Sequence, residues 1–151
     1  MRAVRRENRW IRGERDLLLR LRAIGLAATV PTLLRLPMPR LARLLEPRRA
    51  RSRPAAGTIE RVVAEVDTAL VQGAPLVRPG CLTRGITRFF FLRRAGAPVD
   101  LVFGMGKPVD GYEGHCWLDL DGEPFMESTD PRPVFAEVFR IAHRGAGRLA
   151  A

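Results

Sequence analysis

The sequence predicts an α+β protein in which helices precede a small antiparallel sheet. Apolar residues recur at helical spacing as far as Gly96, and from Val99 onward they alternate with polar ones. Asp121-Gly122 between two alternating segments is a strong hairpin signal. At 151 residues the chain is long enough for one domain with a modest core.

The N-terminal part is basic and amphipathic. We expect residues 2–13 to fray and residues 14–30 to form a helix with a leucine-rich face. Pro31 then permits a second short helix through Leu36, and further leucines form an apolar stripe before Pro47. This part of the chain is predicted to be helical.

Residues 47–57 have no periodicity and carry four arginines, which is typical of a linker. We therefore predict a basic helical N-terminal region over residues 1–57 and a catalytic domain over residues 58–151.

Two helices are predicted in the second region. Thr58 is a suitable N-cap for the first, which has a face of valines and leucines. The second helix is expected to begin at Cys81, after a turn at Pro79-Gly80, and to end at Gly96.

Three strands are expected, over residues 99–105, 115–120 and 123–128. The intervening segment 106–114 is rich in glycine and is predicted to be a flexible loop, and Gly104 and Gly106 suggest the same mobility. The apolar residues after Pro131 permit a short helix.

The charge of the chain is unusual. Lys and Arg total 26 against 16 Asp and Glu, a net charge of +10, and Lys107 is the only lysine. Such a charge can indicate nucleic-acid or membrane-surface binding. The arginines lie at scattered helical spacings without interleaved aromatics, which favours a basic face that meets an acidic protein or peptide. No nucleic-acid partner is expected, and membrane contact through the N-terminal helices is the less favoured possibility.

The cysteine content favours a reducing compartment. There are two cysteines, fewer than a secreted disulfide scaffold of this size normally carries. No signal peptide is visible, and the apolar stretch 23–34 is too short to span a bilayer. We expect a cytoplasmic protein.

Cys81 is the candidate nucleophile. A thiol attacks a carbonyl as its thiolate, and the first turn of a helix stabilises an anion through its free N–H groups and dipole. The same N–H groups can form an oxyanion hole. The alternative is that Cys81 is a buried core residue without a catalytic role.

His115, at the start of a predicted strand, is the candidate base, and a carboxylate on the paired strand should orient it. With a three-residue hairpin loop, Glu127 lies opposite His115; with a two-residue loop, Ser128 does. Asp130 is the fallback acid. Asp119 shares the His115 face but lies about 13 Å along the strand.

The other candidates have weaker claims. Cys116 follows His115 on a strand, so the two side chains point to opposite faces, and Cys116 is expected to be buried. His143 is interpreted as structural. Two Cys and two His in this arrangement make a poor zinc site, and a single Gly-x-Gly is too weak for nucleotide binding, so neither metal nor cofactor is predicted.

Several short motifs together resemble a known family. They are Cys-Leu-x-Arg at 81–84, a helix ending in Arg-Arg-Ala-Gly, the strand Asp-Leu-Val-Phe-Gly at 100–104, and Gly-His-Cys-Trp-Leu-Asp at 114–119 followed by Asp-Gly. This pattern resembles the transglutaminase-like leader peptidases of lasso-peptide biosynthesis, related to the C-terminal half of the microcin-processing protein B. The similarity covers residues 59–130 well and extends loosely over most of the chain.

The resemblance implies a papain-like core and a cysteine peptidase that cuts a ribosomally made precursor at the leader–core junction. A separate macrolactam synthetase would then act on the freed core. The family's Cys-His-Asp triad maps to Cys81, His115 and Glu127, with Glu in place of Asp. In split systems of this family a separate small protein binds the leader, which implies such a partner here. A transglutaminase-like acyltransferase or amidase, or a non-catalytic peptide-binding scaffold, stays open as an alternative.

Overall fold

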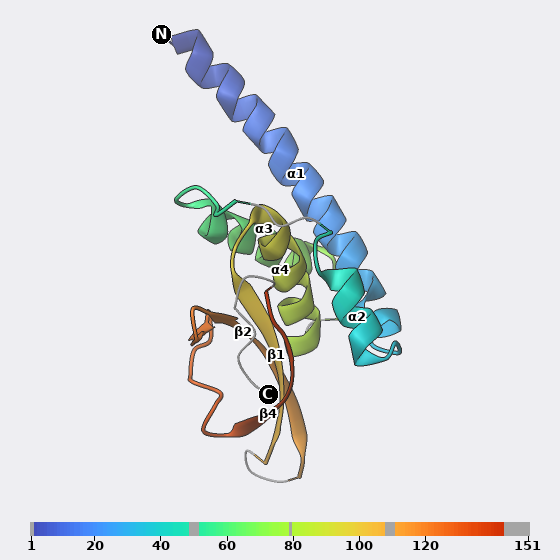
Figure 1. Cartoon of the computed structure of the whole chain (residues 1–151). Coiled ribbons are helices and arrows are strands. Elements are labelled where there is room, and N and C mark those ends of the chain that lie inside the picture. Colours follow the sequence, from blue (N-terminus) through green and yellow to red (C-terminus); the bar gives the residue numbers. More distant parts are fainter. Residues whose placement is uncertain (1, 49–51, 79, 108–110, 144–151) are drawn as a thin grey trace.

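The computed structural model describes residues 2–48, 52–78, 80–107 and 111–143, with side chains from residue 15 onward. Four helices precede four strands, which confirms the predicted α+β class (Figure 1). The elements are α1 (Arg2–Leu33), α2 (Met38–Leu45), α3 (Thr58–Gln72), α4 (Cys81–Ala95), β1 (Val99–Gly106), β2 (Glu113–Leu120), β3 (Glu123–Phe125) and β4 (Phe135–Ile141).

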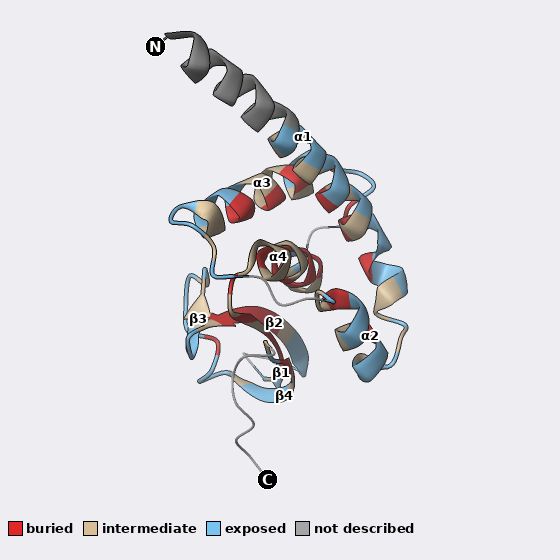
Figure 2. Cartoon of the chain, turned by 45° about the horizontal axis from the view of Figure 1, so that its top comes forward, coloured by how far each residue is buried: buried red, intermediate tan, exposed pale blue. Residues whose placement is uncertain are grey.

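Helix α4 lies at the centre of the molecule. One side of it packs on the sheet, and the other side packs on α1 and α3, while α2 contacts its C-terminal part (Figure 2). Phe89 and Leu92 of α4 are completely buried in this core, together with Leu41 of α2, Val66 of α3 and Leu101 of β1. A helix that is covered on both sides is a rigid support for whatever its first turn carries.

The helix boundaries differ from expectation at three places. α1 begins at Arg2 and continues through Leu33 with Pro31 inside it, so residues 2–13 are helical and Pro31 does not begin a separate helix. Gly57, with φ of +77°, precedes α3 and is its N-cap, so Thr58 is the first helical residue rather than the cap. Glycine adopts this left-handed conformation without a steric penalty, and that explains its position at the cap.

The sheet is antiparallel with strand order β3-β2-β1-β4. The segment after Pro131 forms β4 and not the expected helix. The apolar residues of this segment fit the period of a helix and that of a strand. In the structure Phe139 and Ile141 alternate into the core, and β4 pairs with the otherwise open edge of β1. Tertiary pairing therefore decided between two locally possible structures.

The β2–β3 hairpin has a two-residue loop, so the three-residue loop in the sequence argument is wrong. Leu120 pairs with Glu123, and Asp121 and Gly122 both have positive φ, as a tight primed turn requires. β3 is also shorter than predicted and ends at Phe125, with Met126 at φ of +58°. The chain thus leaves the sheet before it reaches the level of His115.

Gly104 and Gly106 lie within β1 and not in a mobile loop. A Cβ on Gly104 would come within 2.7 Å of the Trp117 ring, and one on Gly106 within 2.1 Å of the Val134 carbonyl oxygen. These glycines mark close packing. The predicted loop 106–114 falls partly on residues 108–110, which lie outside the described residues.

None of the described helices is both long enough and apolar enough to cross a membrane. The predicted boundary at residue 57 stays a prediction. Ala23, Ala27 and Val30 of α1 are buried, and α1 packs on α3 and α4, so the N-terminal helices contribute to the common core.

Candidate active site

Cys81 is the first residue of α4 and is partly exposed. Gly80 precedes it as the N-cap without a side-chain capping bond, and the first intrahelical bond runs from the Arg84 N–H to the Gly80 carbonyl. The N–H groups of Cys81, Leu82 and Thr83 are therefore outside the helical hydrogen-bond pattern. This arrangement offers hydrogen-bond donors to an oxyanion formed at Cys81.

The first turns of α4 lie against the face of β2 that carries Cys116. Gly85 is one turn after Cys81, and a Cβ built there would come within 2.8 Å of the Cys116 Sγ. Such an approach requires glycine on the helix and a small side chain on the strand. It brings the Cys81 end of α4 next to the residue that follows His115.

His115 on β2 pairs with Glu127, its Nε2 lying 3.2 Å from the Glu127 Oε2. The two side chains are 21% and 16% exposed, so the contact is partly shielded from water. Pairing occurs although Glu127 lies beyond β3, because the chain turns at Met126. Had the two-residue register continued, Ser128 would lie opposite His115.

Asp130, the fallback acid, binds Arg132 and not His115. Its carboxylate accepts hydrogen bonds from the Arg132 guanidinium at 2.8–3.0 Å and from the Arg132 backbone N–H at 3.0 Å. These hydrogen bonds from Arg132 lower the pKa of Asp130. Of the two candidate acids, the structure places Glu127 at His115.

Two aromatic rings hold the imidazole of His115. Trp117 stacks on it at 5.9 Å between centroids with 19° between planes, and Phe135 of β4 lies 5.0 Å away. Phe135 reaches this face because the β1–β4 register shifts between Phe103 and Gly104, which reverses the alternation of β4. Sequence reasoning missed Phe135, and the glycines of β1 were the only signal of the crowding around it.

Cys116 is buried in the core, as expected, at 2% exposure. Burial raises the pKa of its thiol well above the ordinary range, and the nearby charges of Cys81 and then Glu127 raise that pKa further. A thiol in this state is a poor nucleophile. The same influences show that Cys81 and Glu127 both lie near Cys116.

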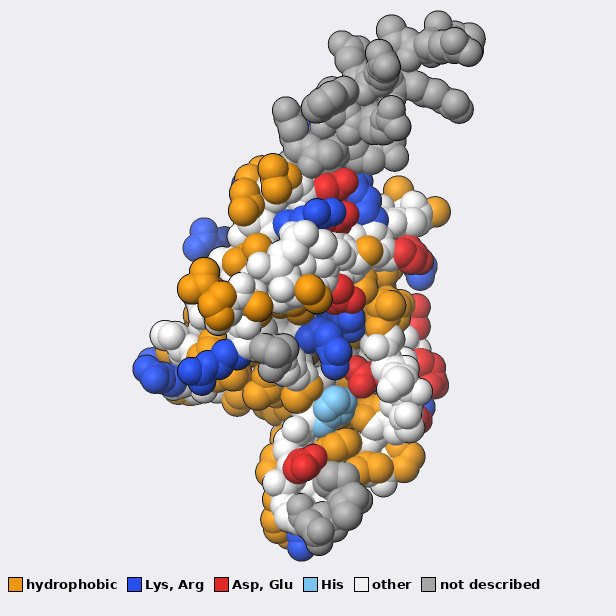
Figure 3. Space-filling model, turned by 180° about the vertical axis from the view of Figure 1, so that it is seen from behind, with side chains coloured by type: hydrophobic (Ala, Val, Ile, Leu, Met, Phe, Trp, Pro, Cys, Tyr) orange, Lys and Arg blue, Asp and Glu red, His pale blue; other side chains and the backbone are white. Residues whose placement is uncertain are grey.

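The described residues bring His115 and Glu127 into contact and pack the start of α4 against Cys116, the residue after His115, with no hydrogen bond between the Cys81 thiol and His115. Catalytic hydrogen bonds are often longer without substrate and tighten when it binds. In the view of Figure 3, a histidine side chain is open to the surface among hydrophobic side chains, with Lys or Arg side chains above it.

A cleft of about 520 Å³ opens beside Cys81 on the side of α3. Its walls come from the end of α3, the turn that follows, and the start of α4. In one wall, Arg88 donates two hydrogen bonds to Asp67, at 2.8 and 2.6 Å, and this ion pair ties α4 to α3.

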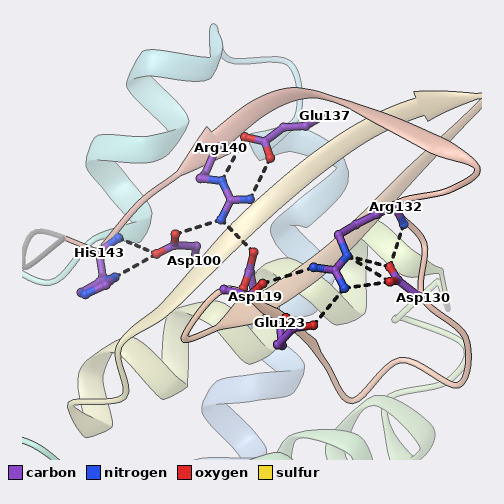
Figure 4. Close-up of polar contacts among 9 residues, drawn as sticks. Asp100, Asp119, Glu123, Asp130, Arg132, Glu137, Arg140 and His143 are labelled. Atoms are coloured by element: carbon purple, nitrogen blue, oxygen red, sulfur yellow. Dashed lines mark hydrogen bonds and ion pairs between the residues drawn. The ribbon is translucent and has the colours of Figure 1, made fainter. Parts of the chain in front are cut away.

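A second polar cluster lies on the sheet face opposite to α4. Arg140 donates to both Asp100 and Asp119 at 3.0 Å, and Asp100 also accepts bonds from His143 (Figure 4). Asp119 is therefore part of this network and not of the His115 site. Among the described residues, no three His, Cys, Asp or Glu side chains are grouped as metal ligands.

Comparison with protein families gives one match: the model of the transglutaminase-like superfamily fits residues 26–140. This match covers all of the elements that build the site, from the second half of α1 to β4. The search of curated proteins and the search of solved structures each give no match.

Proposed function

Because the chain belongs to the transglutaminase-like superfamily, which includes cysteine peptidases and acyltransferases, we propose that it is a cysteine peptidase. Its substrate is a ribosomally made lasso-peptide precursor, cleaved at the leader–core junction in the cytoplasm with the help of a separate leader-binding protein. The His115–Glu127 pair beside the Cys81 end of α4 is the observation that carries the peptidase proposal. The choice of precursor rests on the motifs at residues 81–84 and 100–122.

The proposed reaction assigns one role to each residue. The Cys81 thiolate attacks the scissile carbonyl, and the uncapped N–H groups of α4 stabilise the oxyanion. His115 takes the thiol proton and returns it to the leaving amine, after which water hydrolyses the thioester. Glu127 accepts from Nε2–H, which fixes the tautomer and leaves Nδ1 as the nitrogen that takes the thiol proton.

The decisive experiment combines the purified chain, the leader-binding protein and the precursor. Wild type should yield a free leader and a free core, whereas Cys81→Ala should yield neither. Cys116→Ala is the matched control, because it removes the other thiol and should leave cleavage within a few-fold of wild type. Persistent cleavage by Cys81→Ala would show that the nucleophile is wrongly assigned.

Mass spectrometry of the same reactions separates hydrolysis from acyl transfer. Hydrolysis adds one water and gives two peptides, while transfer to an amine releases ammonia or an amine and gives one joined product. A superfamily that contains acyltransferases makes this comparison necessary. If neither product forms and the precursor still binds, the chain is a peptide-binding scaffold.

A further inference from the structure

The cleft beside Cys81 has a largely apolar wall on the side of α3. Its lining includes apolar side chains from the end of α3 and the turn after it: Leu70, Val71, Ala74 and Val77. Val77 is 2% exposed and forms a dry floor, while Val71 is 79% exposed at the rim. A concave site of this kind takes an apolar group.

The charges in the lining are unequally matched. Asp67 and Arg88 satisfy each other through two hydrogen bonds. Arg84, one turn into α4 and exposed, has no carboxylate partner among the described residues. In its described lining, the cleft therefore combines an apolar wall with one cation, Arg84, that has no carboxylate partner.

The position of the cleft decides which half of a substrate enters it. Its described lining comes from α3, α4 and the turn between them, and neither His115 nor Glu127 contributes to it. His115 delivers the proton to the leaving amine, so the leaving group must lie on the sheet side of Cys81. The acyl half of the substrate then lies on the opposite side, over the cleft.

We infer that the cleft is a specificity site for the acyl half of the substrate, taking an apolar side chain next to an acidic group that pairs with Arg84. The inference rests on the proposed function, because it needs Cys81 as the acylated residue. It applies equally to a peptide segment that precedes a cleaved bond and to the acyl donor of a transfer reaction.

Peptidyl acyloxymethyl ketones test this inference, because they carry only the acyl half. The thiolate forms a C–S bond with the methylene carbon next to the ketone, and the C–O bond breaks to release a carboxylate. The two residues before the warhead are varied one at a time as Leu, Ala, Lys and Glu. Labelling of Cys81 in the full chain is followed by intact mass and peptide mapping.

Leucine at one of the two positions should label Cys81 about tenfold faster than lysine there, the range expected for a shaped apolar pocket. Val71→Asp should remove most of this advantage. Leu76→Asp is the matched control, because Leu76 is 75% exposed in the turn that follows α3, is not among the described residues that line the cleft, and should leave the advantage intact. Arg84→Glu should reverse a preference for glutamate over lysine at the other position.

If neither position gives labelling of Cys81 at least threefold faster with leucine than with lysine, the inference is wrong. It is also wrong if Val71→Asp and Leu76→Asp reduce the leucine advantage equally. Iodoacetamide, which does not use the cleft, reports on the proposed function separately. If iodoacetamide alkylates Cys81 at the same rate in wild type and His115→Ala, the catalytic pair is wrongly assigned. If His115→Ala slows this alkylation but the ketones show no leucine preference, only the specificity site is rejected. Cys81 that no reagent of the panel labels counts against both.

Discussion

Glu127 and Asp130 are three residues apart, and their hydrogen-bond partners distinguish their roles. Glu127 contacts His115, while Asp130 is bound on both oxygens by Arg132. The sequence narrowed the acid to these two residues, but it reached Glu127 through a hairpin loop of the wrong length. The left-handed turn at Met126, which redirects the chain, has no signature in the sequence because that conformation favours glycine or asparagine.

Replacing Glu127 by Gln should lower kcat by about 10²- to 10⁴-fold, because an amide can hold the wrong imidazole tautomer. Glu127→Asp should retain more activity, since the carboxylate is kept. Asp130→Asn is the control and should change kcat less than about threefold. The rates are measured on the precursor with the leader-binding protein present, and equal losses in Glu127→Gln and Asp130→Asn would reject the assignment.

At the scale of elements, β1 and β4 build the support of the site. The register shift after Phe103 turns Phe135 toward His115, and Gly104 leaves room for the rings of Trp117 and Phe135. A Cβ on Gly104 would meet Trp117 at 2.7 Å and Phe135 at 3.0 Å. The register shift of β4 and the lack of a side chain at Gly104 thus orient the ring of His115.

Gly104→Ala should destabilise the fold by about 1–3 kcal/mol through overpacking, and it should lower kcat by displacing the rings that hold His115. Gly25→Ala is the control, because Gly25 lies on α1 with no atom within 4 Å of a new Cβ. That change should be neutral or stabilising by up to about 1 kcal/mol. Chemical denaturation and kcat are measured for both. A Gly104→Ala protein as stable and active as wild type would show that the crowding relaxes without consequence.

The elements that sequence analysis predicted well are those with one clear local signal. α4 begins at Cys81 and is followed by Gly96 at φ of +94°, and β1 alternates as expected. β4 and the β1 glycines were misread, because a strand at the edge of the sheet and a tightly packed glycine depend on neighbours distant in the chain. Cys81 and His115 could be proposed from residue type and position, whereas the contact with Glu127 required the three-dimensional path after β3.

At the scale of the whole molecule, a chain with a net charge of +10 buries two charged side chains among its described residues, Arg88 and Asp119. Arg140 connects Asp100 on β1, Asp119 on β2 and Glu137 on its own strand, and so ties three strands of the sheet together (Figure 4). The Asp119 side chain is 8% exposed, and its Oδ1 lacks a hydrogen-bond partner among the described residues. Among the described residues, Arg140 is the cation that pairs with this buried carboxylate.

The pKa values of this network predict how stability changes with pH. Burial by itself raises the pKa of Asp100, but hydrogen bonds from His143 and Arg140 outweigh it and lower that pKa. The pKa of Glu137 is lowered chiefly by its hydrogen bond from Arg140. A lowered folded-state pKa stabilises the fold above the unfolded value, about 4, and this contribution is lost as the pH falls through the folded value.

Arg140→Met should lower the free energy of unfolding by about 3 kcal/mol at pH 7, because it leaves the Asp119 carboxylate buried without a counter-charge. The difference from wild type should narrow between pH 5 and pH 2 (roughly the range in which carboxylates protonate), since wild type then also loses the pairs of Arg140 with Asp100 and Glu137. Arg132→Met, which removes an exposed guanidinium, is the matched control and should change the denaturation midpoint little. Urea unfolding from pH 7 to pH 2 measures all three proteins. If Arg140→Met is no less stable than Arg132→Met, or if its deficit stays constant in acid, the network does not stabilise the sheet in the way its geometry indicates.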